Sequence, residues 1–153
     1  IGTQLYTLED VGVSKVAALR TKLYAATGVE LNTFAQKLSA ENQNKVFRKI
    51  DFVFDTFDNI PSRQLVATYC REQKIPCLHL GLDAATGEVC WNEKYQLPQN
   101  WQPPAAGACD IPLARNIVLW TALVGLQTCF QFWEKQQQKN YFLDLSTLTI
   151  SEY

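Results

Sequence analysis

The segment DFVFDTFDNIPSR, residues 51–63, places the tightest constraint on what this chain can fold into. Residues 50–57 form an apolar run of the kind that favours a β-strand, and Asp51 and Asp55 interrupt it. Pro61 suits the first turn of a helix, and the residues that follow continue with helical spacing. The segment therefore predicts a buried strand that ends in acidic residues and leads directly into a helix.

Helix and strand patterns alternate along the chain, which indicates an α/β protein. This alternation predicts a mainly parallel sheet with helices on both faces, and ligands of such sheets bind at the carboxyl ends of the strands. The end of the 50–57 strand is therefore the first place to look for chemistry. The expected elements are helix 14–28, strand 29–34, helix 39–48, strand 50–57, helix 61–73, strands 74–82 and 88–92, helix 111–136, and strands 141–145 and 147–151.

Residues 93–108, EKYQLPQNWQPPAAGA, form the clearest loop. A loop of this length in a compact domain is often a lid or a crossover connection, although a plain surface connection is an equally good interpretation. The chain has 153 residues, which suggests a single domain over 1–153 with this loop inside it.

Composition excludes several classes of function. The formal net charge is -1, whereas a nucleic-acid-binding protein needs a basic face. Five scattered cysteines without a CxxC pair, and a single histidine, argue against a zinc site and favour a reducing compartment such as the cytoplasm. The longest apolar run, residues 117–129, contains too many polar residues to span a bilayer.

The acidic end of the 50–57 strand has two interpretations. Asp55 and Asp58 flank its last residues, Asn59 follows, and Arg63 lies one helical turn further on. Carboxylates here can hold Mg²⁺ against phosphates, and an arginine can neutralise an anion. The same residues can instead cap the turn, with Arg63 and Asp58 forming a surface salt bridge. The residue pattern favours this second interpretation slightly.

Three motifs in the same order resemble the ThiF/MoeB/ubiquitin-activating-enzyme superfamily. DFVFDTFDNIPSRQLVATYCREQKIPCLHLGL contains the D-x-x-D-N strand end, the following arginine and a strand that begins with Ile-Pro. TQLYTLEDVGVSKVAAL is similar to the R-Q-x-x-x-x-x-D-x-G-x-x-K segment of that family, and CDIPLARNIVLWTALVGLQ is similar to the stretch that begins at its cysteine. Together these motifs cover most of the chain.

The resemblance implies a Rossmann-like domain that uses ATP and Mg²⁺ to adenylate the C-terminal carboxylate of a ubiquitin-like or sulfur-carrier protein. Asp58 would organise the metal ion and the triphosphate, while Lys15 and Gln4 would contact phosphates. Asn59 and Arg63 would support the turn at the strand end. Such proteins act as homodimers or heterodimers, with the small carrier as their partner.

The chain also departs from the family pattern. No GxGxxG loop is present, Thr3 stands where the family has an arginine, and the paired CxxC motifs are missing. We therefore expect a fold that is incomplete at the N-terminus, either as part of a longer protein or as a degenerate member. An inactive docking or dimerisation module is the alternative function.

Cys109 is the candidate nucleophile among the cysteines. It precedes a helix, whose N-terminus favours a thiolate, although the neighbouring Asp110 opposes it. Its position also matches the cysteine of the family, and a half-buried structural role is equally plausible. Arg115 could approach a substrate carboxylate or pair with Asp110. The remaining cysteines and His79 are expected to be core residues; these cysteines are Cys70, Cys77, Cys90 and Cys129.

Overall fold

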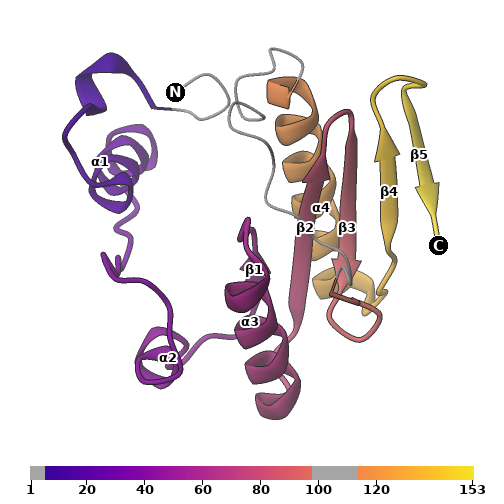
Figure 1. Cartoon of the computed structure of the whole chain (residues 1–153), viewed down its shortest axis with the longest axis horizontal. Helices are drawn as coiled ribbons and strands as arrows, with labels where there is room; N and C mark the ends of the chain where they lie inside the picture. The colour runs from indigo at the N-terminus through magenta and orange to yellow at the C-terminus, as the bar shows by residue number, and fades with distance from the viewer. Residues whose placement is uncertain (1–5, 98–113) are drawn as a thin grey trace.

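A computed structural model describes residues 6–97 and 114–153 of the chain (Figure 1). Five strands form one sheet, and helices lie on both sides of it. The strands are β1 (Val53–Asp55), β2 (Cys77–Asp83), β3 (Thr86–Trp91), β4 (Tyr141–Asp144) and β5 (Thr149–Glu152). The helices are the 3-10 turn η1 (Leu8–Asp10), α1 (Lys15–Thr27), α2 (Gln43–Val46), α3 (Ile60–Gln73) and α4 (Ala114–Lys135).

The sheet has the order β1-β2-β3-β4-β5 and is mixed rather than mainly parallel. Only β1 and β2 run parallel, with α3 as their crossover, and the other three pairings in the described parts of the chain are antiparallel. The cause lies in the connections. Two residues, Ala84 and Ala85, join β2 to β3, and so short a hairpin allows only antiparallel pairing. The turn of the hairpin therefore lies between Asp83 and Thr86.

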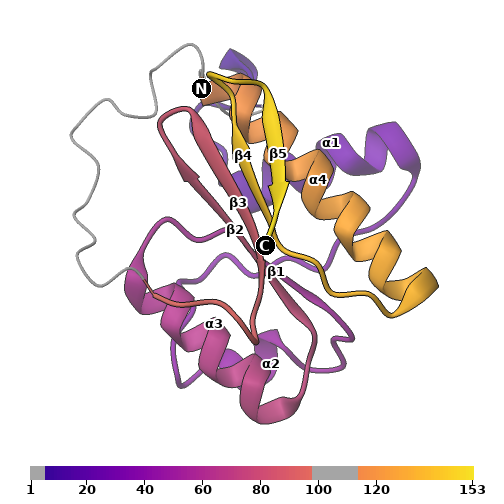
Figure 2. The same cartoon turned by 90° about the vertical axis from the view of Figure 1, so that its right-hand side faces the viewer.

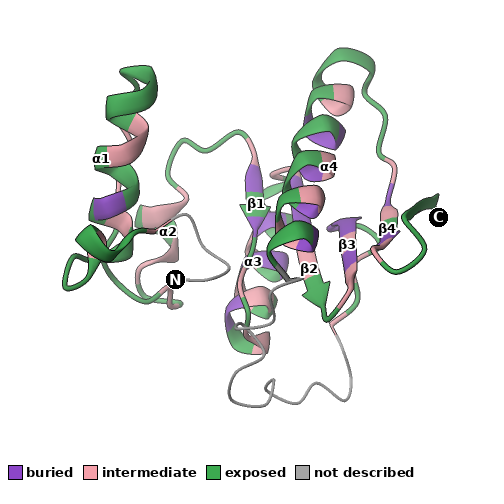
Figure 3. Ribbon diagram, turned by 90° about the horizontal axis from the view of Figure 1, so that it is seen from above, coloured by how far each residue is buried: buried purple, intermediate pink, exposed green. Residues whose placement is uncertain are grey.

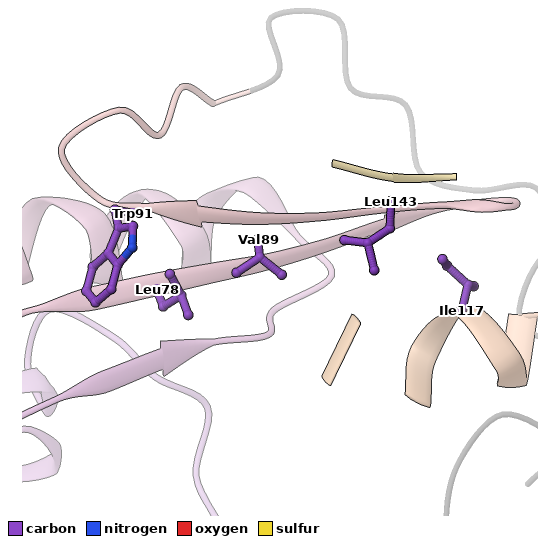
Figure 4. Close-up of a cluster of buried hydrophobic side chains, with 5 residues drawn as sticks. All are labelled: Leu78, Val89, Trp91, Ile117 and Leu143. Carbon is purple, nitrogen blue, oxygen red and sulfur yellow. The ribbon is translucent and has the colours of Figure 1, made fainter. Parts of the chain in front are cut away.

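The two faces of the sheet are covered by different helices, as the sequence predicts (Figure 2). On one side α4 packs over β2 and β3, and the buried residues there come from β2, β3, β4 and α4 (Figure 4). They are Leu78, Val89, Trp91, Ile117 and Leu143. A side chain at Gly125 of α4 would place its Cβ 2.7 Å from Leu80 Cδ2, so the glycine allows α4 to lie close to the sheet.

On the opposite face, α3 packs against β1 and β2. The buried apolar residues here are Val53, Val66, Cys70 and Cys77. Strand alternation explains the difference between the faces, since Leu78 points toward α4 while its neighbours Cys77 and His79 lie on the side of α3. This second face also carries the polar residues that matter for the site.

Residues 6–49 pack only loosely on this core. Ala18 is their one buried residue, and most of α1 is exposed (Figure 3). A stack of Phe47 on Tyr69, with ring centroids 4.9 Å apart, connects this segment to α3. The strand expected over 29–34 is absent, because no neighbouring strand is available to its backbone groups in the described parts of the chain. The helix expected over 39–48 is reduced to α2.

The long helix predicted over 111–136 is confirmed as α4, within the residues that the structure describes. The predicted loop spans residues 93–108, and its part beyond residue 97 lies outside the described residues. Among the described helices, none combines the length and the apolar character that a bilayer span requires.

Candidate functional site

The carboxyl end of β1 leads into α3 through a turn that its own side chains stabilise. Asp55 Oδ1 accepts a hydrogen bond from the Phe57 backbone N–H at 2.9 Å. Asn59 is the N-cap of α3, and its Oδ1 accepts from the Ser62 N–H at 3.0 Å. Pro61 lies in the first turn, as the sequence predicts, although the helix already begins at Ile60. Asp55 and Asn59 therefore supply the side-chain hydrogen bonds to the backbone of this turn.

Asp58 is exposed beside this helix N-terminus. The only hydrogen bond to its carboxylate among the described residues comes from Asn59 Nδ2, at 3.3 Å. A carboxylate at this position remains free to bind a cation, and Mg²⁺ on a nucleotide needs only one or two protein carboxylates because the phosphates supply other ligands. No cluster of three or more His, Cys, Asp or Glu side chains suited to a metal occurs in the parts of the chain that the structure describes. Asp58 thus fits a metal ion shared with phosphates.

Arg63 does not form the predicted surface salt bridge with Asp58. Its guanidinium turns inward, where Nη2 donates to the Leu80 carbonyl at 2.7 Å and Nη1 lies 3.5 Å from Asp55 Oδ2. Nη1 also donates to Tyr95 Oη at 3.4 Å. The side chain is 12% exposed. These contacts hold Arg63 from three directions, because α3 places it over the ends of β1 and β2.

Behind Arg63 lies a buried polar network that the sequence reasoning missed. Asp55 is opposite His79 in the parallel register of β1 and β2, and its Oδ2 lies 2.7 Å from His79 Nδ1. The other ring nitrogen, Nε2, lies 3.0 Å from Asn92 Oδ1. Tyr95 stacks on the imidazole at 3.8 Å between centroids, and burial raises the pKa of its phenol above the ordinary value despite the opposing charge of Arg63.

His79 is buried as predicted, but in a polar environment instead of an apolar one. Aligning the two strands in parallel register would have paired Asp55 with His79. No sequence signal identifies Asn92 or Tyr95, which reach the network from the end of β3 and the residues after it.

The structure brings together some of the predicted site residues and leaves others apart. Asp58, Asn59 and Arg63 share the end of β1. Lys15 is exposed at the start of α1, which stands away from β1 (Figures 1 and 3). No hydrogen bond or ion pair joins Lys15 to those three residues within the described ranges; its carbonyl accepts from Tyr6 Oη at 3.4 Å. Gln4 and Cys109 lie outside the described residues.

A cavity of about 300 Å³ lies at the opposite end of the parallel strand pair. It is lined by residues at the end of α3 and around the start of β2, including Cys70, Lys74 and Pro76. Ligands of parallel sheets bind at the carboxyl ends of the strands. Location therefore favours the open surface around Asp58 over this cavity.

Comparison with known protein families identifies the class of protein. The chain belongs to the ThiF family, whose pattern it matches over residues 2–141. A curated relative, the sulfur carrier protein adenylyltransferase of Thermus thermophilus, is 38% identical over 63 residues. The aligned part is 40% of this chain and 23% of that protein.

Solved structures share the fold at low sequence identity. The crystal structure of PaaA matches all of this chain and 59% of its own length, with a TM-score of 0.68 and 15% identity. E. coli MccB with MccA-N7isoASN matches 97% of this chain and 51% of its own, with a TM-score of 0.75 and 12% identity. E. coli MccB with ATP has a TM-score of 0.69, 13% identity and 50% of its length covered. The chain thus spans about half the length of these structures.

Proposed function

We propose that residues 1–153 together form part of a ThiF-like adenylation domain. The domain would use ATP to adenylate the C-terminal carboxylate of a ubiquitin-like or sulfur-carrier protein. The observation that carries the proposal is the carboxyl end of β1, where an exposed Asp58 stands beside a rigid helix N-terminus and a fixed arginine. The name of the Thermus relative and the E. coli MccB structure with ATP support the same chemistry.

The chemistry asks the protein mainly to position charges. In adenylation a carboxylate oxygen attacks the α-phosphorus of ATP, the bond to the β-phosphate oxygen breaks, and pyrophosphate leaves. A metal ion supplies Lewis-acid stabilisation of the phosphate charge. Asp58 would hold that ion, the backbone N–H groups of Asn59 and Ile60 would face the phosphates, and Arg63 would face the anions. Lys15 and Gln4 would complete the phosphate contacts, which requires α1 to approach β1.

Cys109 would act after adenylation. A thiolate attacks the acyl carbon of the adenylate, the bond to the AMP oxygen breaks, AMP leaves, and a thioester results. We propose a reducing compartment such as the cytoplasm for this reaction. In the described residues Cys70, Cys77, Cys90 and Cys129 are all free thiols, which supports that location.

Pyrophosphate exchange tests the function. The full-length protein is incubated with ATP, labelled pyrophosphate and small ubiquitin-like proteins from the same source, and incorporation of label into ATP is measured. We expect exchange with at least one carrier and a loss of at least about a hundredfold in Asp58→Asn. Asp51→Asn is the matched control, since Asp51 is also exposed and lies at the other end of β1. An absence of exchange with every carrier would favour the docking module instead.

We also propose that the protein forms a homodimer through the outer face of α4. That face carries a row of large apolar side chains with alternating spacings of four and three residues, the pattern of a helix-pairing seam. They lie roughly opposite the residues that α4 buries on the sheet. The row consists of Leu119, Leu123, Leu126, Phe130 and Trp133, which are 50–65% exposed.

A second copy of the chain fits this row well. At these exposures the five side chains offer about 600 Å² per chain, so a twofold pair would bury about 1,200 Å², the lower limit of a standard interface. Antiparallel pairing of two α4 helices would also oppose their dipoles. Sedimentation equilibrium tests the dimer. Leu123→Glu should produce monomers, while Gln64→Glu on the exposed surface of α3 should not. A wild-type monomer at micromolar concentration would contradict the proposal.

A further inference from the structure

The protonation state of His79 follows from its hydrogen-bond partners. The imidazole is 1% exposed, and both of its nitrogens face oxygen atoms. Nδ1 faces Asp55 Oδ2 at 2.7 Å, and Nε2 faces Asn92 Oδ1 at 3.0 Å. Asn92 is fixed in this orientation because its Nδ2 donates to the Ala67 carbonyl at 3.0 Å.

Beside an ionised Asp55, a neutral imidazole cannot satisfy both neighbours. It carries one N–H and one lone pair, so one nitrogen would direct its lone pair at an oxygen lone pair in a buried site. Turning the Asn92 amide over would not help, because its oxygen would then face the Ala67 carbonyl and the hydrogen bond to Ala67 would be lost. Two N–H groups on His79 satisfy every partner at once.

The other groups that face His79 are uncharged. Cys77 Sγ lies 3.7 Å from Nε2, and its pKa is raised by the hydrogen bond with Cys70 and by burial, so it remains a thiol. Tyr95 remains a phenol, since burial raises its pKa. The charged groups of the centre are therefore Asp55, His79 and Arg63. One carboxylate against two cations leaves a net charge of plus one.

The distances indicate how this charge is distributed. Asp55 Oδ2 lies 2.7 Å from the histidine but 3.5 Å from the arginine. Asp55 is therefore paired mainly with His79, and the positive charge of Arg63 is only weakly compensated. Arg63 is also the member of the three with exposed surface, at 12% of its side chain.

We propose that His79 is a buried imidazolium that neutralises Asp55 and so leaves the positive charge of Arg63 available to an oxyanion. His79 is a positioning residue in this arrangement, and Arg63 makes the contact. The identity of the anion, a phosphate group or the carboxylate to be activated, rests on the proposed function. The protonation of His79 does not.

Nitrogen-15 NMR of histidine-labelled protein tests the first half. The chain contains one histidine, so subtracting the spectrum of His79→Gln isolates its signals even in a longer protein. At neutral pH we expect a directly bonded proton on both ring nitrogens. A ring nitrogen without a proton would overturn the proposal.

Binding of simple anions tests the second half, with pyrophosphate and formate titrated separately so that the responding anion is identified. His79→Gln and Asn92→Asp each reduce the net charge of the centre to zero, and we expect both to weaken binding roughly tenfold. Asn92→Asp should retain the doubly protonated imidazole. If His79 had only a structural role, Asn92→Asp would therefore bind the anion as tightly as the wild type. Cys77→Ser is the control that preserves the charge.

Wild-type affinity in Asn92→Asp, or no binding of either anion by the wild type, would overturn the anion site. These readouts are independent of catalysis. Failure of pyrophosphate exchange with both results intact would count against adenylation alone.

Discussion

Asp55 and Asp58 lie three residues apart in one motif, yet the structure places them in opposite environments. Asp55 is 1% exposed, and its carboxylate has hydrogen-bond contacts with His79, Arg63 and the Phe57 N–H. Asp58 is exposed. Replacing Asp55 with alanine would leave a buried imidazolium and a largely buried guanidinium without their counter-charge. We therefore expect Asp55→Ala to destabilise the fold and Asp58→Ala to leave stability unchanged.

The size of the effect follows from the burial of the pair. Removing one partner of a buried ion pair costs about 3–5 kcal/mol in the free energy of unfolding, and the short contact with His79 contributes more of it than the longer contact with Arg63. In a domain of this size each kcal/mol shifts the melting temperature by about 2–4 °C. Asp55→Ala should therefore melt roughly 6–20 °C lower than the wild type.

Thermal unfolding followed by circular dichroism, together with urea titration, measures both variants under the same conditions. Asp58→Ala should remain within about 0.5 kcal/mol of the wild type, as expected for an exposed side chain. Asp55→Asn keeps the shape and removes the charge, so it separates the charge from the packing. If Asp55→Ala and Asp58→Ala melted at the same temperature, the buried ion pair would not contribute to stability.

Three further predictions concern other parts of the molecule. Asn140→Ala should cost about 1–3 kcal/mol in urea unfolding, because it removes Asn140 Oδ1, which accepts from the buried backbone N–H of Trp91 at 2.9 Å. The exposed Gln137→Ala should cost almost nothing. Hydrogen bonds from the Ser146 side chain and backbone lower the pKa of Asp144. The contribution of Asp144 to stability is therefore present above the ordinary carboxyl pKa and is lost as the pH falls through the lowered value. An NMR titration of the wild type, compared with Asp144→Asn, checks this shift. Burial raises the pKa of Cys90 and Cys129, so these thiols should react with Ellman's reagent only after unfolding, and a rapidly reacting thiol should disappear in Cys109→Ser.

Local signals in the sequence were sufficient for the elements around the site. Asn59 and Pro61 mark the start of α3 because capping depends on neighbouring residues alone. The α/β class and the placement of helices on both faces follow from the same kind of pattern. The parallel proportion of the sheet was overestimated, because a hairpin between β2 and β3 depends on where two adjacent strands turn.

Long-range pairings could not be read from the sequence in the same way. The sequence allows a surface salt bridge between Arg63 and Asp58, but α3 turns Arg63 toward Asp55, Leu80 and Tyr95. The strand expected over 29–34 has a suitable pattern and no partner in the described sheet, which shows that a strand also requires its neighbour. Lys15 has the spacing of the family motif, but nothing in the described structure brings it to β1.

The proposed reaction activates a carboxylate at the α-phosphate of ATP. An oxygen-18 label in the C-terminal carboxylate of the carrier tests it most directly. After one round of adenylation and acyl transfer, we predict one labelled oxygen in AMP, because the carboxylate oxygen bonds to the α-phosphorus and remains there when the acyl group leaves. Label in inorganic phosphate, or in neither product while ATP is consumed, would contradict it.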